Sequence, residues 1–138
     1  MNFNQHTIIG FIGKNAETKQ LSNGTPVTKF SVATTRSWKD DQGEWKDKTQ
    51  WHTVAAYGQS FTQIAPRLTR GTHVFVQGEL ITREYDRTIQ VPNGKKTIEH
   101  VIQQLAVELK ADIIRLLDRP SNAGASETPA ATNDDVPL

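Results

Sequence analysis

The sequence predicts an all-β domain of five short strands with one short helix, followed by a disordered tail. Apolar β-branched and aromatic residues alternate with polar ones over most of residues 1–118, between turns that contain Gly and Asn. Residues 119–138 are rich in Pro, Ala, Ser, Thr and Asn and hold few bulky apolar side chains, so they cannot repay the entropy lost on ordering. The domain is therefore expected to span residues 1–118, and the tail residues 119–138.

The N-terminal half contains three expected strands. The run HTIIGFIG is interrupted by Gly10 and Gly13, which suggests a bent strand. The run LSNGTPVTKFSVATT contains an Asn-Gly turn and then an alternation that places Phe30 and Val32 on one face. A polar turn, DDQG, precedes the third strand, QWHTVAAY, which is expected to begin at Trp51.

A helix and a fourth strand follow. Apolar residues at helical spacing predict a short helix over Ser60–Leu68, with the hydroxyl of Ser60 as its N-cap. A hairpin turn is expected at residues 92–94, where the sequence reads Pro-Asn-Gly. The run HVFVQGELITREY is the fourth strand, whose inward face is expected to carry Val74, Val76 and Leu80.

Residues 98–117 fit two interpretations. Apolar residues recur there at nearly helical spacing, so the segment taken alone is an amphipathic helix. Five strands with one helix between the third and the fourth form an OB-fold barrel, which requires a last strand in this segment. We therefore expect a closing strand within Leu105–Leu109. The apolar residues with helical spacing are Val101, Leu105, Leu109, Ile113 and Leu116.

The charge of the chain divides unevenly. Residues 1–119 carry 16 basic and 12 acidic residues, whereas residues 120–138 carry three acidic residues and no basic one. This division suggests a basic body that meets a polyanion and an acidic tail that does not.

The absence of cysteine excludes disulfides and zinc–thiolate sites. Neither a secretory signal nor a long apolar run is evident, so a soluble, cytoplasmic protein is expected.

The tryptophans and tyrosines point to a binding surface. Trp38 and Trp45 flank the polar turn, and Trp51 begins the third strand. Tyr57 lies six positions after Trp51, so the two-residue period of a strand places both on one face, while Val54 faces the other way. Large aromatics opposite small aliphatic residues indicate an aromatic platform on the outside of the barrel.

Basic residues accompany these aromatics, and alternation places Arg83 and Tyr85 on one strand face. Such a surface suits unpaired bases, because stacking on an aromatic ring contributes about 1–3 kcal/mol per base whatever the base. The cations then neutralise the phosphates. For any single ring, packing in a core or a subunit interface is the alternative. The candidate DNA-binding residues are Trp38, Trp51, Tyr57 and Tyr85 for stacking, and Arg36, Lys46, Lys48, Arg83 and Arg87 for phosphate contact.

The chain resembles the bacterial single-stranded DNA-binding proteins in the order and spacing of several runs. These are GFIGKNAE, FSVATTRSWKDDQGEWKDKTQWHTVAAYG, TRGTHVFVQGELITREY and the terminal DDVPL. The resemblance implies an OB fold, a homotetramer, and binding of single-stranded DNA without sequence specificity in replication, recombination and repair. Such a protein works at the nucleoid, without catalysis and without a cofactor.

Two segments depart from the family pattern. The stretch between Tyr85 and Leu105 is longer than usual, which predicts an extended hairpin between the last two strands. The basic residues of this hairpin, Arg87, Lys95 and Lys96, either add DNA contacts or form a solvated loop face. The chain also ends in leucine where the family commonly has phenylalanine.

The tip of the tail is expected to bind partner proteins. Its acidic residues have the wrong sign for DNA, and two bulky apolar residues stand beside them at the extreme end. This combination suits a partner pocket with an apolar floor and a basic rim. The resemblance implies that replication, recombination and repair proteins bind here. The partner-binding residues are Asp134, Asp135, Val136, Pro137 and Leu138.

Two alternative functions fit the sequence less well than coating of single-stranded DNA. An OB-fold nuclease with metal-dependent chemistry needs converging carboxylates, whereas the acidic residues here are scattered. A primosome-type OB module would bind DNA weakly, and its simpler relatives lack an acidic tail. The four histidines show no metal-ligand spacing, and His52 is expected to be a hydrogen-bonded interior or interface residue.

Overall fold

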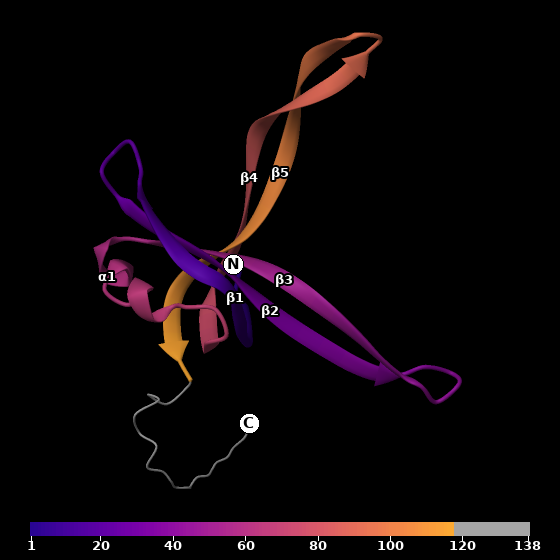
Figure 1. The fold of residues 1–138 in the computed structure, drawn as a ribbon. Coiled ribbons are helices and arrows are strands. Elements are labelled where there is room, and N and C mark those ends of the chain that lie inside the picture. The colour runs from indigo at the N-terminus through magenta and orange to yellow at the C-terminus, as the bar shows by residue number, and fades with distance from the viewer. Residues whose placement is uncertain (118–138) are drawn as a thin grey trace, which may run out of the picture.

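The protein is a closed five-stranded β-barrel from which two long two-stranded arms project (Figure 1). The computed structural model describes residues 1–117, so the expected tail at 119–138 lies outside the described residues. The strand order around the barrel is β1-β2-β3-β5-β4, and every neighbouring pair is antiparallel except β3 and β5. The strands are β1 (His6–Gln20), β2 (Pro26–Lys39), β3 (Trp45–Tyr57), β4 (His73–Asn93) and β5 (Lys96–Leu116).

The barrel core consists mainly of apolar residues at alternate strand positions. Phe30 and Val32 are buried on β2 as expected, and Val74 and Val76 are buried on β4. Leu80 was expected to join them, but its side chain is 42 % exposed. The reason is that β4 leaves the barrel after Gly78 and continues into an arm that has no second layer to cover Leu80.

Residues 96–116 form a strand, which resolves the ambiguity of the apolar spacing. A spacing of four residues is one helical turn and also two strand repeats, so the same pattern fits both structures. The expected closing strand is confirmed, but it extends well beyond Leu105–Leu109 on both sides. Leu109 is 1 % exposed within the barrel, whereas Leu105 is 60 % exposed, because β5 passes from the arm into the barrel between these two residues.

A bulge marks the place where the β4–β5 arm joins the barrel. Gln77 pairs with Ile113 and Gly78 pairs with Ala111, which leaves Asp112 without a partner across the ladder. A Cβ atom on Gly78 would lie 1.9 Å from the carbonyl oxygen of Lys110. Glycine is therefore required where the two backbones approach so closely.

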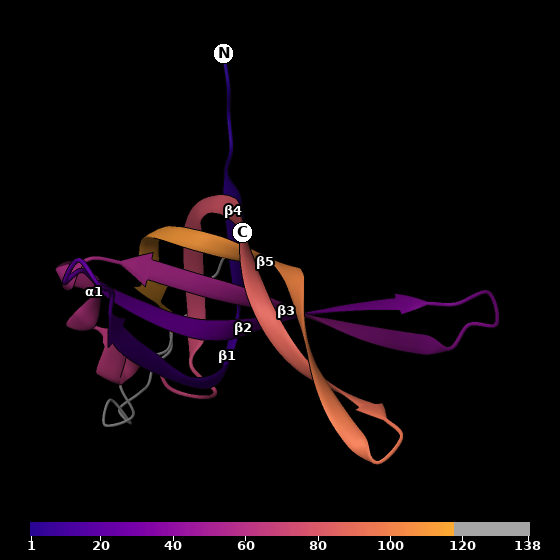
Figure 2. The same ribbon diagram turned by 90° about the horizontal axis from the view of Figure 1, so that it is seen from above.

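The two arms are uninterrupted ladders that point away from the barrel in different directions (Figure 2). In the β2–β3 arm the pairing continues to Lys39 and Trp45, so β3 begins at Trp45 rather than at Trp51 as expected from the sequence. The polar turn at its end is held by Asp40, whose Oδ1 accepts hydrogen bonds from the backbone N–H groups of Gln42 and Glu44, both at 2.9 Å. The extended hairpin is confirmed as the β4–β5 arm.

The helical connection between β3 and β4 is shorter than the sequence suggested. It consists of α1 (Gln59–Thr62) and a 3-10 turn, η1 (Ala65–Arg67). Gly58 rather than Ser60 occupies the N-cap position, and no side chain caps the helix. A proline within the predicted helix ends it early, because proline cannot donate the helical hydrogen bond. Leu68 after the turn is fully buried against the core.

Candidate nucleic-acid interface

Alternation along β3 separates an inner from an outer surface. Val54 and Ala56 are fully buried in the barrel, whereas Trp51, at an odd-numbered position, is 59 % exposed. Tyr57 shares the face of Trp51 and is half-buried. The expected outward aromatic pair is therefore present, on what we call the outer face.

The ring of Trp51 on β3 reaches across β2 to Gly13 of β1. A Cβ atom on Gly13 would lie 2.2 Å from the Cζ3 atom of Trp51, so a side chain larger than hydrogen would displace the ring. The sequence pattern had assigned Gly13 to a strand bend, and nothing in it indicated a contact with residue 51. The exposed Trp51 ring therefore packs against Gly13, where only glycine leaves room for it.

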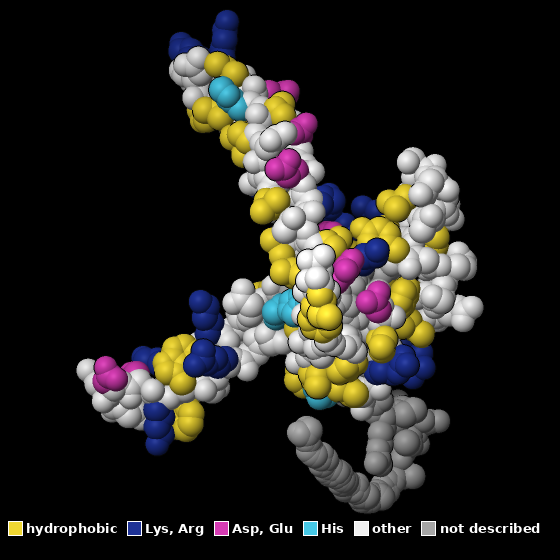
Figure 3. All heavy atoms as spheres, turned by 180° about the vertical axis from the view of Figure 1, so that it is seen from behind, with side chains coloured by type: hydrophobic (Ala, Val, Ile, Leu, Met, Phe, Trp, Pro, Cys, Tyr) yellow, Lys and Arg dark blue, Asp and Glu magenta, His cyan; other side chains and the backbone are white. Residues whose placement is uncertain are grey.

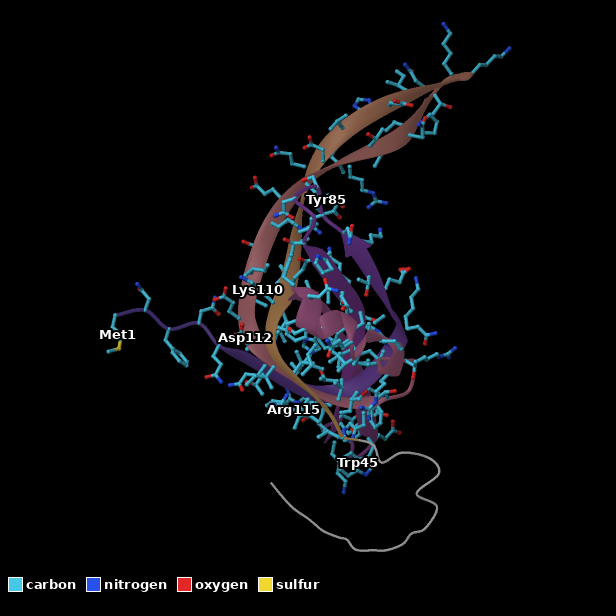
Figure 4. The ribbon with its side chains drawn as sticks, turned by 90° about the vertical axis from the view of Figure 1, so that its left-hand side faces the viewer. Met1, Trp45, Tyr85, Lys110, Asp112 and Arg115 are labelled. Carbon is cyan, nitrogen blue, oxygen red and sulfur yellow. The ribbon has the colours of Figure 1, made fainter. Side chains whose placement is uncertain are left out.

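Tyr85 occupies the outer face of the β4–β5 arm near the barrel (Figure 4). The guanidinium carbon of Arg83 lies 5.6 Å from the centroid of its ring, which is within cation–π range. The Tyr85 hydroxyl donates a hydrogen bond of 2.9 Å to Oε1 of Gln104 on the facing strand. Arg87 reaches the same oxygen at 3.4 Å. These contacts hold the ring in one orientation while leaving it 39 % exposed.

A groove of about 330 Å³ runs beside Tyr57, and we call it the Tyr57 groove. Lys19 from β1, Lys29 from β2 and Arg83 from β4 line it together with the tyrosine. The Nζ atom of Lys110 lies 6.0 Å from the Tyr57 ring centroid. A groove with an aromatic side chain and cations from three strands can hold a base against the ring and a phosphate at its rim.

A buried carboxylate lies between two of these cations. Oε2 of Glu108 accepts hydrogen bonds from Nζ of Lys29 and from Nη2 of Arg83, both at 3.2 Å, and the Glu108 side chain is 3 % exposed. Burial by itself would raise the pKa of Glu108, but the hydrogen bonds and charges of Arg83 and Lys29 outweigh it and hold the pKa below the ordinary value. The same contacts raise the pKa of Arg83.

The other predicted residues form a second surface, on the opposite face of the β2–β3 ladder. Trp38 pairs with Lys46, and Arg36 pairs with Lys48, so these four share the even-numbered face while Trp51 lies on the odd-numbered one. The Arg36 guanidinium lies 5.9 Å from the Trp38 ring centroid. A pocket of about 510 Å³ forms along this surface, with Arg36, Trp38 and Lys48 among its lining residues.

The cations on the β2–β3 arm are not all equally free to bind a phosphate. Nζ of Lys46 lies 3.9 Å from the carboxylate of Asp40 and 3.8 Å from that of Glu44, so acidic groups of the turn partly neutralise it. Trp45, which had no assigned role, is 67 % exposed and has Nζ of Lys39 5.4 Å from its ring centroid. Lysine and arginine side chains gather toward the ends of both arms (Figure 3).

His6 and His52 lie side by side near the bases of the two arms, whereas His100 lies far along the β4–β5 arm. His52 Nε2 and Thr34 Oγ1 are 2.9 Å apart, so the expected hydrogen-bonded role of His52 is confirmed. The ring of His6 packs edge-on against His52, with 5.6 Å between the centroids. Burial and then the nearby His6 lower the pKa of His52. Within residues 1–117 no group of acidic residues or histidines is placed to hold a metal ion.

Comparison with known proteins identifies the family of the chain. Residues 3–109 match the model of the Single-strand binding protein family. The chain belongs to this family. Its members are DNA-binding proteins, and the chain is accordingly a single-stranded DNA-binding protein and not an enzyme. This match confirms the resemblance to the family that was inferred from the sequence. In the part of the chain that the structure describes, no helix is long and apolar enough to span a membrane.

Solved structures support the same assignment. The Plasmodium falciparum single-strand binding protein, whose structure is a complex with single-stranded DNA, is 29% identical, with a TM-score of 0.66 over 86% of this chain and 97% of that chain. The small single-stranded DNA-binding protein from Streptomyces coelicolor is 25% identical, with a TM-score of 0.57 over 84% and 95% of the two chains. The Thermus aquaticus protein, at 21% identity and a TM-score of 0.63, shares the fold over 84% of this chain and 50% of its own.

The contacts of Glu108 predict a pH dependence of stability. Because its pKa is lower in the folded state than the ordinary 4.5, ionised Glu108 favours folding above that pH, and this contribution is lost as the pH falls through the folded-state pKa. The difference in unfolding free energy between wild type and Glu108→Gln should be constant from neutral pH to about pH 5.5 and shrink below about pH 4.5. Urea denaturation followed by circular dichroism measures it, and a difference independent of pH would contradict the ion pairs.

Proposed function

We propose that this family member binds and protects single-stranded DNA without sequence specificity during replication, recombination and repair. Base stacking on Trp38, Trp51, Tyr57 and Tyr85 and neutralisation of phosphates by the cations around them supply the binding energy. The observation that carries the proposal is the outer face, where exposed rings alternate with cations and no base-reading helix is present among residues 1–117. The place of action is the cytoplasm, at the nucleoid, where unpaired DNA arises.

The two arms carry further binding groups beyond the barrel, on the outer face of the β4–β5 arm and on the opposite face of the β2–β3 ladder. The β2–β3 arm carries Arg36, Trp38 and Lys48 in one pocket, and the β4–β5 arm carries Tyr85 and Arg87 on its outer face. A strand that contacts both arms therefore passes from the outer face of the barrel to the opposite face of the β2–β3 ladder. Stacking needs unpaired bases, so duplex DNA of equal length should bind far more weakly.

Replacing Trp51 by alanine should weaken binding of a thymidine oligomer by about 1–3 kcal/mol, the contribution of one stacked base. The reason is that its ring is exposed and fixed above Gly13. Fluorescence anisotropy of a labelled oligomer measures the affinity without depending on the tryptophan signal.

The matched control is Phe3→Ala, which removes another exposed ring, 84 % accessible, that lies outside the strands. Its affinity should equal that of the wild type. Unchanged affinity of Trp51→Ala, with an intact circular dichroism spectrum, would show that Trp51 has a packing role instead. Duplex DNA bound as tightly as the oligomer would refute the stacking surface as a whole.

The barrel also offers a surface for self-association, and we propose a homotetramer. Ile9 and Phe11 on β1 are 53 % and 54 % exposed and point outward; Ile9 pairs with Phe75 of β4, and Ile113 of β5, which is 36 % exposed, lies on the same side of the sheet beyond β4. A contiguous apolar patch on a sheet is typical of an interface between subunits. Phe11 also stacks on His73 of β4, with ring centroids 4.6 Å apart, which restrains the Phe11 ring.

Sedimentation equilibrium at micromolar concentration should give the mass of a tetramer for the wild type and a smaller species for Phe11→Glu, because a charge cannot be buried unpaired in the interface. The control is Val101→Glu, a valine on the β4–β5 arm that is 65 % exposed. Its mass should remain that of the tetramer. An effect at Val101 and none at Phe11 would place the interface on the arm.

The tail tip, Asp134 to Leu138, lies outside the described residues, and its partner-binding role is a proposal from its sequence. Deleting residues 133–138 should abolish capture of replication and repair proteins and leave DNA affinity equal or slightly higher, because an anionic competitor is removed. Pull-down with the full-length and shortened chains, each saturated with the same oligomer, measures this. Retained partners, or lost DNA binding, would disprove the role.

A further inference from the structure

Glu108 connects strands that are not neighbours in the barrel. It lies on β5, and its Oε2 atom bonds Lys29 of β2 and Arg83 of β4, each at 3.2 Å. In the barrel order β1-β2-β3-β5-β4, β3 lies between β2 and β5, so backbone pairing does not join the strands of Lys29 and Glu108 directly. One carboxylate oxygen thus fixes cations from two other strands at the Tyr57 groove.

The stability of the barrel does not explain a carboxylate at this position. Glu108 is 3 % exposed, and its second oxygen, Oε1, is buried with no hydrogen-bond partner. Leaving a buried acceptor unpaired is costly, and apolar residues of similar volume commonly replace buried ion pairs without loss of stability. The residue is better explained by what it does to its two partners.

Both partners keep most of their binding capacity. The side chains of Lys29 and Arg83 are 40 % and 46 % exposed, and each donates one hydrogen bond to Glu108. An ammonium has three N–H donors and a guanidinium five, so donors remain for a phosphate. Arg83 also lies over the Tyr85 ring, so the orientation fixed by Glu108 extends to a stacking residue.

We propose that Glu108 is a positioning residue for DNA binding, which fixes Lys29 and Arg83 toward the phosphates of the strand whose bases stack on Tyr57 and Tyr85. The inference rests on the proposed function of the outer face. It also adds Lys29, which the sequence pattern did not single out, to the phosphate-binding residues. Long flexible side chains lose rotational entropy when they bind, and a partner that fixes them beforehand reduces this cost.

The direction in which DNA affinity changes when Glu108 is replaced distinguishes a positioning role from an effect of net charge alone. Glu108 is an anion on a surface that binds a polyanion, so its removal should strengthen binding if net charge alone matters. If Glu108 positions the two cations, its removal weakens binding although the surface becomes more positive. Glu108→Gln is suited to this test because it removes the charge and nearly preserves the volume.

Glu108→Gln should bind a thymidine oligomer about tenfold more weakly than the wild type at moderate salt, a ratio that corresponds to about 1.4 kcal/mol. The matched control is Glu84→Gln, which removes the same charge from the opposite face of the β4–β5 arm, next to Arg83 in sequence. Its affinity should stay equal or rise. Tighter or unchanged binding by Glu108→Gln, or an equal loss in Glu84→Gln, would overturn the inference.

The salt dependence distinguishes positioning from a loss of folded protein. If both cations leave the phosphates, the slope of log affinity against log salt should decrease in magnitude by about 1.4, since each phosphate contact on a single strand contributes about 0.7. Partial unfolding lowers the amount of active protein, which a stoichiometric titration counts, but leaves the slope unchanged. An unchanged slope would therefore contradict the positioning role.

A second variant keeps the test decisive if Glu108→Gln does not fold. Arg83→Lys preserves the charge and the buried carboxylate but loses the planar fork that contacts Glu108 and Tyr85 together. It should bind several-fold more weakly than the wild type, and wild-type affinity would refute positioning. In all these titrations, failure of the wild type to bind the oligomer would refute the proposed function itself, whereas a binding wild type with unaffected variants would refute only the role of Glu108.

Discussion

The shape of the molecule depends on how the barrel closes. Two residue pairs, Val54 with Leu109 and Ala55 with Lys110, join β3 to β5 in parallel. Because the strands run in the same direction, the residues that precede this contact leave the barrel at the same end. On β3 they pair with β2 to form one arm, and on β5 they pair with β4 to form the other. A longer parallel contact would hold these segments against the barrel and leave no fork between the arms.

Every tryptophan and tyrosine of the chain lies near a group that can restrain its ring. Trp38, Trp45, Tyr57 and Tyr85 each have a cation within about 6 Å, and Trp51 rests on Gly13 instead. A free surface ring samples several rotamers and must give them up when a base stacks on it. Restraint in advance lowers this entropic cost, so the surface is partly organised before any ligand arrives.

Local patterns in the sequence were sufficient to locate the first four strands and to assign the faces of β3, but not to fix where β3 begins or to separate strand from helix in β5. Alternation alone placed Trp51 opposite Val54, and the polar turn at Asp40 was recognised from composition. Contacts between distant segments left no such pattern: Gly13 and Trp51 are 38 residues apart, and Lys29 and Glu108 are 79 residues apart. Leu80 was misplaced for a related reason, since alternation gives the face of a strand but not the point at which it leaves the core.

The β4–β5 arm has a consequence for how such a chain can change in length over evolution. From Thr82 to Asn93 its ladder with β5 is in unbroken register, and the residues of the core cluster all lie on the barrel side of this stretch. The arm can therefore gain or lose residues without disturbing the barrel. Inserting or deleting two residues in each strand would keep every more distant side chain on its present face of the arm. Inserting or deleting one residue in each strand would move all of these side chains to the opposite face. Variation in steps of two is thus the route by which the reach of the arm can be altered while the chemistry of its faces is kept.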